Sequence, residues 1–409
     1  MMSNLITTKC LDNERGCEGR VGVIRKLAPK GDISFHPENR GLVLMVQIQR
    51  SKNHKLIIAA LVLLICLLGL WLYGGQSAQP SPHAAIIDND ELLALAAESQ
   101  PNPDIYASSL VKPGDPLFKG LYELQSLRRD LAEKALLPLA EVGNSDAMFW
   151  YGMTVLRSSV LSGGDKWIHE AAMAGNPYAM RRLVPAGETL QDCEWYLGSY
   201  CDDAWADKAQ EAFQQRLQAN PDDVLSRYAA SMDADRAAEA AKQKYYAPMV
   251  KLALKYGQAY EAGELSEVDA AKVVTLLKMA ANDNFAPAMY MLSASFSKYL
   301  GKEESLFYAE KALMLGYNSI VSIYVEGRRS FDSTGNIDEL KSLLPYAYIA
   351  KNYFRDDRFL MLIKYRLEDN KYILTSKEES KAKEQAEKII SEITPVIYID
   401  AIYDVEAYH

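Results

Sequence analysis

The sequence predicts an all-α fold, a solenoid of repeated helix hairpins preceded by one transmembrane helix. Two observations carry this prediction: a motif marked by alanine and glycine that recurs along the chain, and an uninterrupted apolar run near the N-terminus. Apolar residues recur at helical spacing from Leu117 to about Ile393, and hardly any stretch alternates like a strand. Hydrophobic residues make up 49% of the 409 residues, enough for a folded core.

The apolar run spans the 18 residues 56–73 and contains no charged side chain. A helix of this length covers roughly 27 Å at ~1.5 Å per residue, close to the hydrocarbon thickness of a bilayer. Arg50, Lys52 and Lys55 precede the run, which predicts a cytoplasmic N-terminus and an external chain from about residue 76. We expect a single-pass anchor in a bacterial inner membrane. A cleaved signal peptide stays an alternative, although the apolar core of signal peptides is usually shorter.

Charge is unevenly distributed along the chain. Residues 1–55 carry ten Lys/Arg against five Asp/Glu, whereas the whole chain has a formal net charge of −9. The remainder is therefore acidic, which argues against nucleic-acid binding and weakly favours a basic protein partner, although solubility alone also explains it. The cytoplasmic segment 1–55 includes residues 1–44, which show no periodicity. Two hypotheses stay open for residues 1–44: either Met45 is the initiator and they are not translated, or they are disordered.

Residues 74–116 are rich in glycine and proline, which predicts a linker. One short helical piece is expected within it, around residues 91–98. The folded domain is then expected to occupy residues 117–409, on the periplasmic side of the membrane.

Within that domain a motif of two small or apolar residues, a turn residue and an apolar residue recurs. It stands at Gly143 and again 32 residues later at Gly175; a second pair of copies stands at Asn284 and, after another 32 residues, at Gly316. Each copy is typical of a helix end, a left-handed turn residue and the start of the next helix. The residues expected to shape these hairpins are Gly143, Ala147, Tyr151, Gly152, Ala171, Ala172, Gly175, Ala179, Ala280, Ala281, Asn284, Ala288, Leu292, Ala312 and Gly316.

Three segments resemble Sel-one-like repeats, a branch of the tetratricopeptide-type helical solenoids: residues 143–152 (GNSDAMFWYG), 167–175 (WIHEAAMAG) and 278–292 (KMAANDNFAPAMYML). Tyr151-Gly152 stands at the leucine-glycine position of the family, whereas Leu292 is followed by serine. The resemblance covers about residues 130–390 in pieces and weakens between about 188 and 240. It implies stacked helix pairs that assemble complexes or regulate signalling, and the family includes exported immunity proteins against lipase-type toxins delivered by type VI secretion.

Cys193 and Cys201 are the only cysteines expected outside the cytoplasm, where two nearby cysteines usually form a disulfide. A metal site would need two further ligands, and no histidine is near. The aromatic residues of this loop and its C-terminal flank are Trp195, Tyr196, Tyr200 and Trp205. These aromatic side chains either form a partner-binding edge or fill the core of an irregular segment, and both interpretations stay open.

No catalytic, cofactor or metal site is predicted. His169 is the only histidine inside the repeat region, and a lone histidine on a helix is more often a packing or surface residue than a general base. The sequence contains no nucleophile elbow, phosphate-binding glycine loop or dinucleotide fingerprint. The C-terminal stretch 395–409 is unexpectedly apolar; either it packs back over the last repeat as a cap, or it meets a partner.

These predictions combine into one leading hypothesis: a non-catalytic protein–protein interaction module, anchored in the inner membrane, with its repeat domain in the periplasm. An immunity protein that neutralises a secreted lipase-type toxin is a narrower alternative. An envelope enzyme with an unrecognised site is the rival from another class, and a structural tether of the envelope is a third interpretation.

Overall fold

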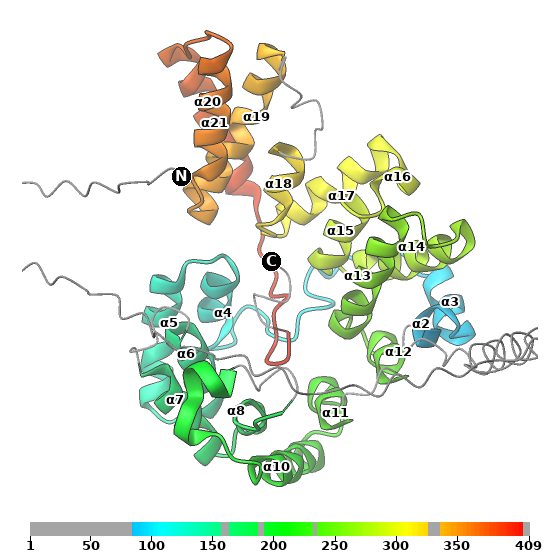
Figure 1. Ribbon diagram of the computed structural model, residues 1–409, viewed down its shortest axis with the longest axis vertical. Helices are drawn as coiled ribbons and strands as arrows, with labels where there is room; N and C mark the ends of the chain where they lie inside the picture. The colour runs from blue at the N-terminus through cyan, green and yellow to red at the C-terminus, as the bar shows by residue number, and fades with distance from the viewer. Residues whose placement is uncertain (1–83, 157–162, 187–191, 232–234, 326–335, 404–409) are drawn as a thin grey trace, which may run out of the picture. The chain divides into compact units, whose positions relative to one another are not determined.

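The structure is a computed structural model that describes residues 84–156, 163–186, 192–231, 235–325 and 336–403. The expected transmembrane segment 56–73, the cytoplasmic segment 1–55 and the start of the linker lie outside these residues. Within the described ranges, no helix is both long and apolar enough to cross a bilayer. All regular secondary structure in the same ranges is helical, which confirms the predicted all-α class (Figure 1).

The α-helices are α2 (Ala84–Ile87), α3 (Asp90–Ala97), α4 (Phe118–Gln125), α5 (Arg129–Glu141), α6 (Ser145–Leu156), α7 (Gly164–Met173), α8 (Pro177–Arg182), α10 (Trp205–Ala219), α11 (Val224–Ser231), α12 (Asp235–Lys242), α13 (Ala247–Glu261), α14 (Glu267–Asn282), α15 (Ala286–Ser293), α16 (Ser297–Leu300), α17 (Lys302–Met314), α18 (Ile320–Val325), α19 (Ile337–Ile349), α20 (Arg358–Asp369) and α21 (Ser376–Glu392). Three short elements interrupt this series, the π-helices η2 (Cys193–Leu197) and η5 (Ala350–Phe354) and the 3-10 helix η3 (Gly198–Tyr200).

Helices pack in the order in which they follow one another along the chain. From α4 to α20, every labelled α-helix contacts its successor, and α21 packs on α19. Most of the connections are tight turns, so that neighbouring helices share long contacts between their apolar faces. The core accordingly runs from one helix pair to the next as a connected series of buried side chains.

The turns that join these helices have the geometry expected from the recurring motif. At Gly143, φ is +91°, its N–H donates to Ala140 O at 3.0 Å, and the N–H of Asn144 donates to Leu139 O at 3.1 Å. This pair of hydrogen bonds closes a helix around a left-handed residue. The same pair of bonds, with φ between +64° and +89°, recurs at Gly175, Asn284 and Gly316. The sequence therefore predicted the backbone conformation at all four positions.

Four more turns of the same kind were not legible in the sequence. The same two hydrogen bonds and a positive φ are found at Leu127, Lys244, Gly263 and Lys371. Three of these residues are neither glycine nor asparagine, although the left-handed conformation strains such side chains. The turn at Lys244 lies just beyond the stretch 188–240 in which no repeat was legible.

Small residues in the motif allow neighbouring helices to approach closely. The motif alanines in the four copies are all buried: Ala147, Ala171, Ala172, Ala179, Ala280, Ala281, Ala288 and Ala312. Gly152 also allows a close approach between helices, because a Cβ on this residue would lie 2.8 Å from Ile168 Cγ1 in α7. A Cβ on Gly164, which faces it from α7, would lie 2.5 Å from the backbone N of Leu156. Helices α6 and α7 are therefore in contact through backbone as well as side chains.

The structure differs from the linker expectation within residues 84–116, the part of the expected linker that it describes. The short helical piece is present as α3, but α3 and α2 are folded against α14 and α12 rather than standing apart (Figure 1). Ile86 and Leu92 are fully buried in this contact. Glycine and proline correctly indicated irregular backbone here, yet irregular backbone can be ordered when its side chains are buried.

The C-terminal segment does not simply cover the last helix pair, as a cap on the last repeat would. Thr375 caps α21 and forms a capping box with Glu378. The chain then leaves the helical series, and residues 394–403 run without regular secondary structure among side chains of much earlier helices. Val396, Ile397, Tyr398 and Ile399 are buried there. The apolar C-terminal stretch thus packs back on the domain, but well beyond the last hairpin.

Candidate functional site

The Cys193–Cys201 loop is a distinct element held on the helical domain by covalent and polar contacts. The disulfide expected from the sequence is present, with the two Cα atoms 5.9 Å apart. An ion pair of 3.1 Å joins Arg182 at the end of α8 to Asp192 at the start of the loop. At the other end, the N–H of Asp202 donates to Leu183 O at 3.1 Å. The loop is therefore fixed at both ends as well as across its middle.

Two of the four candidate aromatic residues face the domain. Trp205 is buried, and its Nε1 donates to the carbonyl of Tyr200 at 3.1 Å. The ring of Tyr200 is stacked on His169 of α7, with centroids 4.5 Å apart and an angle of 22° between the ring planes. Trp205 packs edge-on against the same imidazole at 6.0 Å. His169 thus forms an aromatic cluster with Tyr200 and Trp205, and this cluster joins the loop to α7.

The other two candidates, Trp195 and Tyr196, face solvent. Trp195 is 65% exposed and Tyr196 is 38% exposed, although both lie inside the disulfide-closed loop. The neighbouring carboxylates Glu194, Asp202 and Asp203 are also exposed. Exposed indole and phenol groups are therefore displayed beside negative charge on a backbone that the disulfide holds. Of the four aromatic residues, Trp205 and Tyr200 therefore pack against the domain, whereas Trp195 and Tyr196 are exposed to solvent.

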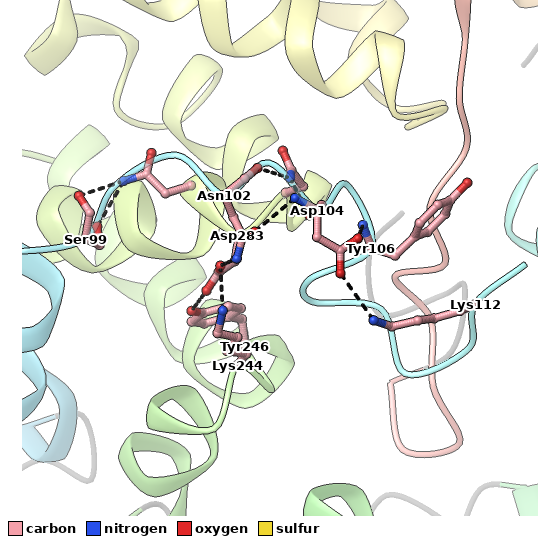
Figure 2. A network of polar contacts seen from close by, with 10 residues as sticks. Ser99, Asn102, Asp104, Tyr106, Lys112, Lys244, Tyr246 and Asp283 are labelled. Carbon is pink, nitrogen blue, oxygen red and sulfur yellow. Dashed lines mark hydrogen bonds and ion pairs between the residues drawn. The ribbon is translucent and has the colours of Figure 1, made fainter.

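A cluster of polar side chains connects the N-terminal segment to the α14–α15 turn (Figure 2). Asp283 accepts hydrogen bonds of 2.6 Å from Asn102 Nδ2 and 2.6 Å from Tyr246 Oη. Lys244 Nζ lies 3.1 Å from the same carboxylate. Asp283 is buried at the end of α14, so these three donors replace the water that it would otherwise bind.

The residues beside Asp283 extend the same cluster. The side chain of Asn282 donates to the Ser99 carbonyl and hydroxyl at 3.2 and 3.0 Å, and Asn284 Nδ2 donates to the carbonyls of Asn102 and Asp104. Figure 2 shows Asp283 on the helical turn beside the segment that carries Ser99, Asn102 and Asp104. Three consecutive side chains of the α14–α15 turn therefore hold residues 99–104 in place.

Proton positions in this cluster follow from its geometry. Burial and the hydrogen bond to Asp283 raise the pKa of Tyr246 above its usual value, so the phenol stays protonated and donates. The N–H of Tyr106 and the nearby Lys112 hold the pKa of Asp104 below its ordinary value. Both effects favour the protonation states that these hydrogen bonds require.

Sequence reasoning did not single out Asp283, because its partners lie up to 181 positions away in the chain. The run Asn282-Asp283-Asn284 was visible as the turn of one repeat, and three polar side chains at one helix end are a usable indication of an anchor. Across the described ranges, no group of three or more His, Cys, Asp or Glu side chains is placed to hold a metal ion. Neither a family model nor a curated protein sequence matches the chain.

Proposed function

We propose that this chain is a non-catalytic protein-interaction module: an array of Sel-one-like helix hairpins, anchored by residues 56–73 and exposed to the periplasm. The sequential contacts of α4 to α20 and the eight turns of one type support the repeat architecture. Such an array presents side chains from many helices on a continuous surface, and it needs no reacting groups to recognise another protein.

The observation that carries this proposal is the display of Trp195. Tryptophan and tyrosine dominate the binding energy of many protein interfaces, because they bury a large area at the cost of few rotatable bonds. An indole with 65% of its surface exposed has that area available. The disulfide and the stack of Tyr200 on His169 restrict the backbone that carries it, which lowers the entropy lost on binding.

The disulfide also supports the proposed location. Disulfides persist in oxidising compartments such as the bacterial periplasm and are rare in the cytosol. A periplasmic position for residues after about 76 agrees with the basic residues that precede the apolar run. The carboxylates beside Trp195 favour a partner whose contacting surface is basic.

The proposal is tested by affinity purification of the full chain, at its natural level, from the cells that produce it. We expect one protein to co-purify in stoichiometric amount with the wild type. Trp195→Ala should weaken its binding by roughly thirtyfold or more, the effect of losing a residue worth about 2 kcal/mol. Tyr365→Ala is the matched control, because Tyr365 is an aromatic residue of α20 with 61% exposure.

Each outcome of this experiment is informative. A partner that stays bound to Trp195→Ala as it does to the wild type would refute the role of the loop. The absence of any co-purifying protein would contradict the module itself. If the partner is a secreted lipase-type toxin, the narrower immunity function applies, and deleting the chain should make cells sensitive to that toxin.

A further inference from the structure

Residues 394–403 are bound to the helical domain in the way a peptide ligand is bound. They form no regular secondary structure, and the domain contacts their backbone at three alternate residues, Thr394, Val396 and Tyr398. The N–H of Thr394 donates to Met314 O at 2.9 Å, and the N–H of Val396 donates to Leu315 O at 3.2 Å. Met314 is the last residue of α17 and Leu315 is its C-cap, and carbonyls at a helix C-terminus have no partner within the helix.

Gln125 continues this backbone recognition from α4. Its Nε2 donates to the carbonyl of Val396 at 2.6 Å, and its Oε1 accepts from the N–H of Tyr398 at 3.2 Å. A carboxamide bonded to a C=O and to the N–H two residues later recognises extended backbone whatever the side chains are. Gln125 is fully buried, so both ends of its amide depend on this segment for the hydrogen bonds that burial requires.

Two side chains of the segment add specificity. Tyr398 is buried, packs against the ring of Tyr317 at 4.9 Å between centroids, and donates its hydroxyl to the Gln125 carbonyl at 3.3 Å. Asp400 is also buried and accepts from Tyr245 Oη at 3.0 Å. The domain thus provides an aromatic contact and, two residues further on, a phenolic donor for a carboxylate.

We propose that Gln125, Met314, Leu315, Tyr317 and Tyr245 form a binding site for extended peptides, which we call the extended-segment site. In this chain its own residues 394–403 occupy the site in cis. A segment of the same chemistry from another protein, with apolar residues around a tyrosine and an aspartate two residues after it, exchanges with them. The site uses different residues from the Trp195 loop and does not depend on the function proposed for that loop.

Exchange is tested in the full chain, with a protease recognition sequence inserted after Ile393. Cutting there leaves the C-terminal segment held only by its non-covalent contacts and removes the effective concentration of about millimolar that a covalent link provides. A labelled peptide with the sequence of residues 394–403 should then enter the site saturably and release the cut segment, as measured by fluorescence anisotropy and mass spectrometry. The uncut chain should bind the same peptide at least tenfold more weakly.

Peptide variants check the contacts. N-methylation at the tyrosine that corresponds to Tyr398 removes the N–H bonded to Gln125, and it should weaken binding by roughly tenfold. Replacing the aspartate that corresponds to Asp400 by alanine should also weaken binding, and a scrambled peptide should not bind. Equal binding of the N-methylated and unmodified peptides would overturn the proposed backbone recognition.

Two results of the cutting experiment would overturn the proposal. One is a cut segment that never exchanges while circular dichroism shows a folded domain. The other is loss of helical structure upon cutting, which would make residues 394–403 an inseparable part of the core. Exchange with retained helicity supports the site.

Discussion

Loss of the disulfide between Cys193 and Cys201 should destabilise the domain measurably. The bond links residues eight positions apart, and closing so short a loop in the unfolded chain is worth roughly 2.5 kcal/mol on the chain-entropy model. Whole domains are stable by only about 5–15 kcal/mol, so the loss is a large fraction of the total. The double variant Cys193→Ser/Cys201→Ser should therefore unfold at a clearly lower urea concentration than the wild type.

The assay is equilibrium unfolding in urea followed by circular dichroism, with and without reductant. Reductant should shift the wild-type midpoint to that of the double variant. It should leave the variant itself unchanged, which controls for Cys10, Cys17 and Cys66. Equal midpoints for wild type and variant under oxidising conditions would refute the reasoning, because the loop would then be held by its ion pair and aromatic stack alone. Reduction should also weaken partner binding through Trp195.

Three further perturbations test other contacts. Gly164→Ala should destabilise the domain by about 1–3 kcal/mol in thermal or urea unfolding, because the new Cβ would clash with the α6 backbone. In the control Gly143→Ala the new Cβ has no atom within 4 Å, so this variant should cost only about 1 kcal/mol, from the positive φ of residue 143. Asp283→Ala leaves the buried hydroxyl of Tyr246 and the amide of Asn102 without their acceptor, so it should cost about 2–3 kcal/mol and expose residues 99–104 to limited proteolysis. The Tyr372 hydroxyl and Thr375 lower the pKa of Glu378 to about 2. The ionised Glu378 therefore stabilises the folded domain fully above about pH 4.5, and this stabilisation is lost as the pH falls toward about 2. The variant Glu378→Gln should lose less stability than the wild type between about pH 6 and about pH 3. A variant with the same acid sensitivity as the wild type would contradict that assignment.

The helical class and the four motif turns were predictable because they depend on local chemistry. Glycine or asparagine at a helix end reports a left-handed residue directly, and paired alanines report close helix contact. The turns at Leu127, Lys244 and Lys371 were not predictable in this way. Their residues have a positive φ that is unfavourable for their side chains, and no glycine or asparagine marks them in the sequence.

The sequence indicated where the candidate site lies in the chain, but not which of its side chains are exposed. Cysteine spacing indicated the disulfide, yet sequence alone could not say that Trp205 is buried while Trp195 is exposed, because that depends on the distant ring of His169. The same reason applies to α21. Lys and Glu dominate the sequence of this helix, and Ala382 and Ala386 are nevertheless buried where it packs on α19.

Contacts between residues far apart in the chain were the hardest feature to predict from the sequence. Asp283 and Gln125 look like ordinary polar residues near helix ends, and their roles come from segments 181 and 271 positions away. Local patterning carries no information about such partners, whereas each of these buried groups must be satisfied by whatever segment covers it. The N-terminal and C-terminal segments were therefore underestimated as parts of the folded domain.

Site-specific photo-crosslinking tests the central claim most directly. A photoreactive phenylalanine analogue placed at Trp195 in the full chain, in its own cells, should link to one partner protein in the periplasm. The same analogue at Tyr365, which is exposed to a similar degree on α20, should not give that product. A folded chain that yields no cross-linked protein from position 195, or the same products from both positions, would contradict a binding role for the disulfide-held loop.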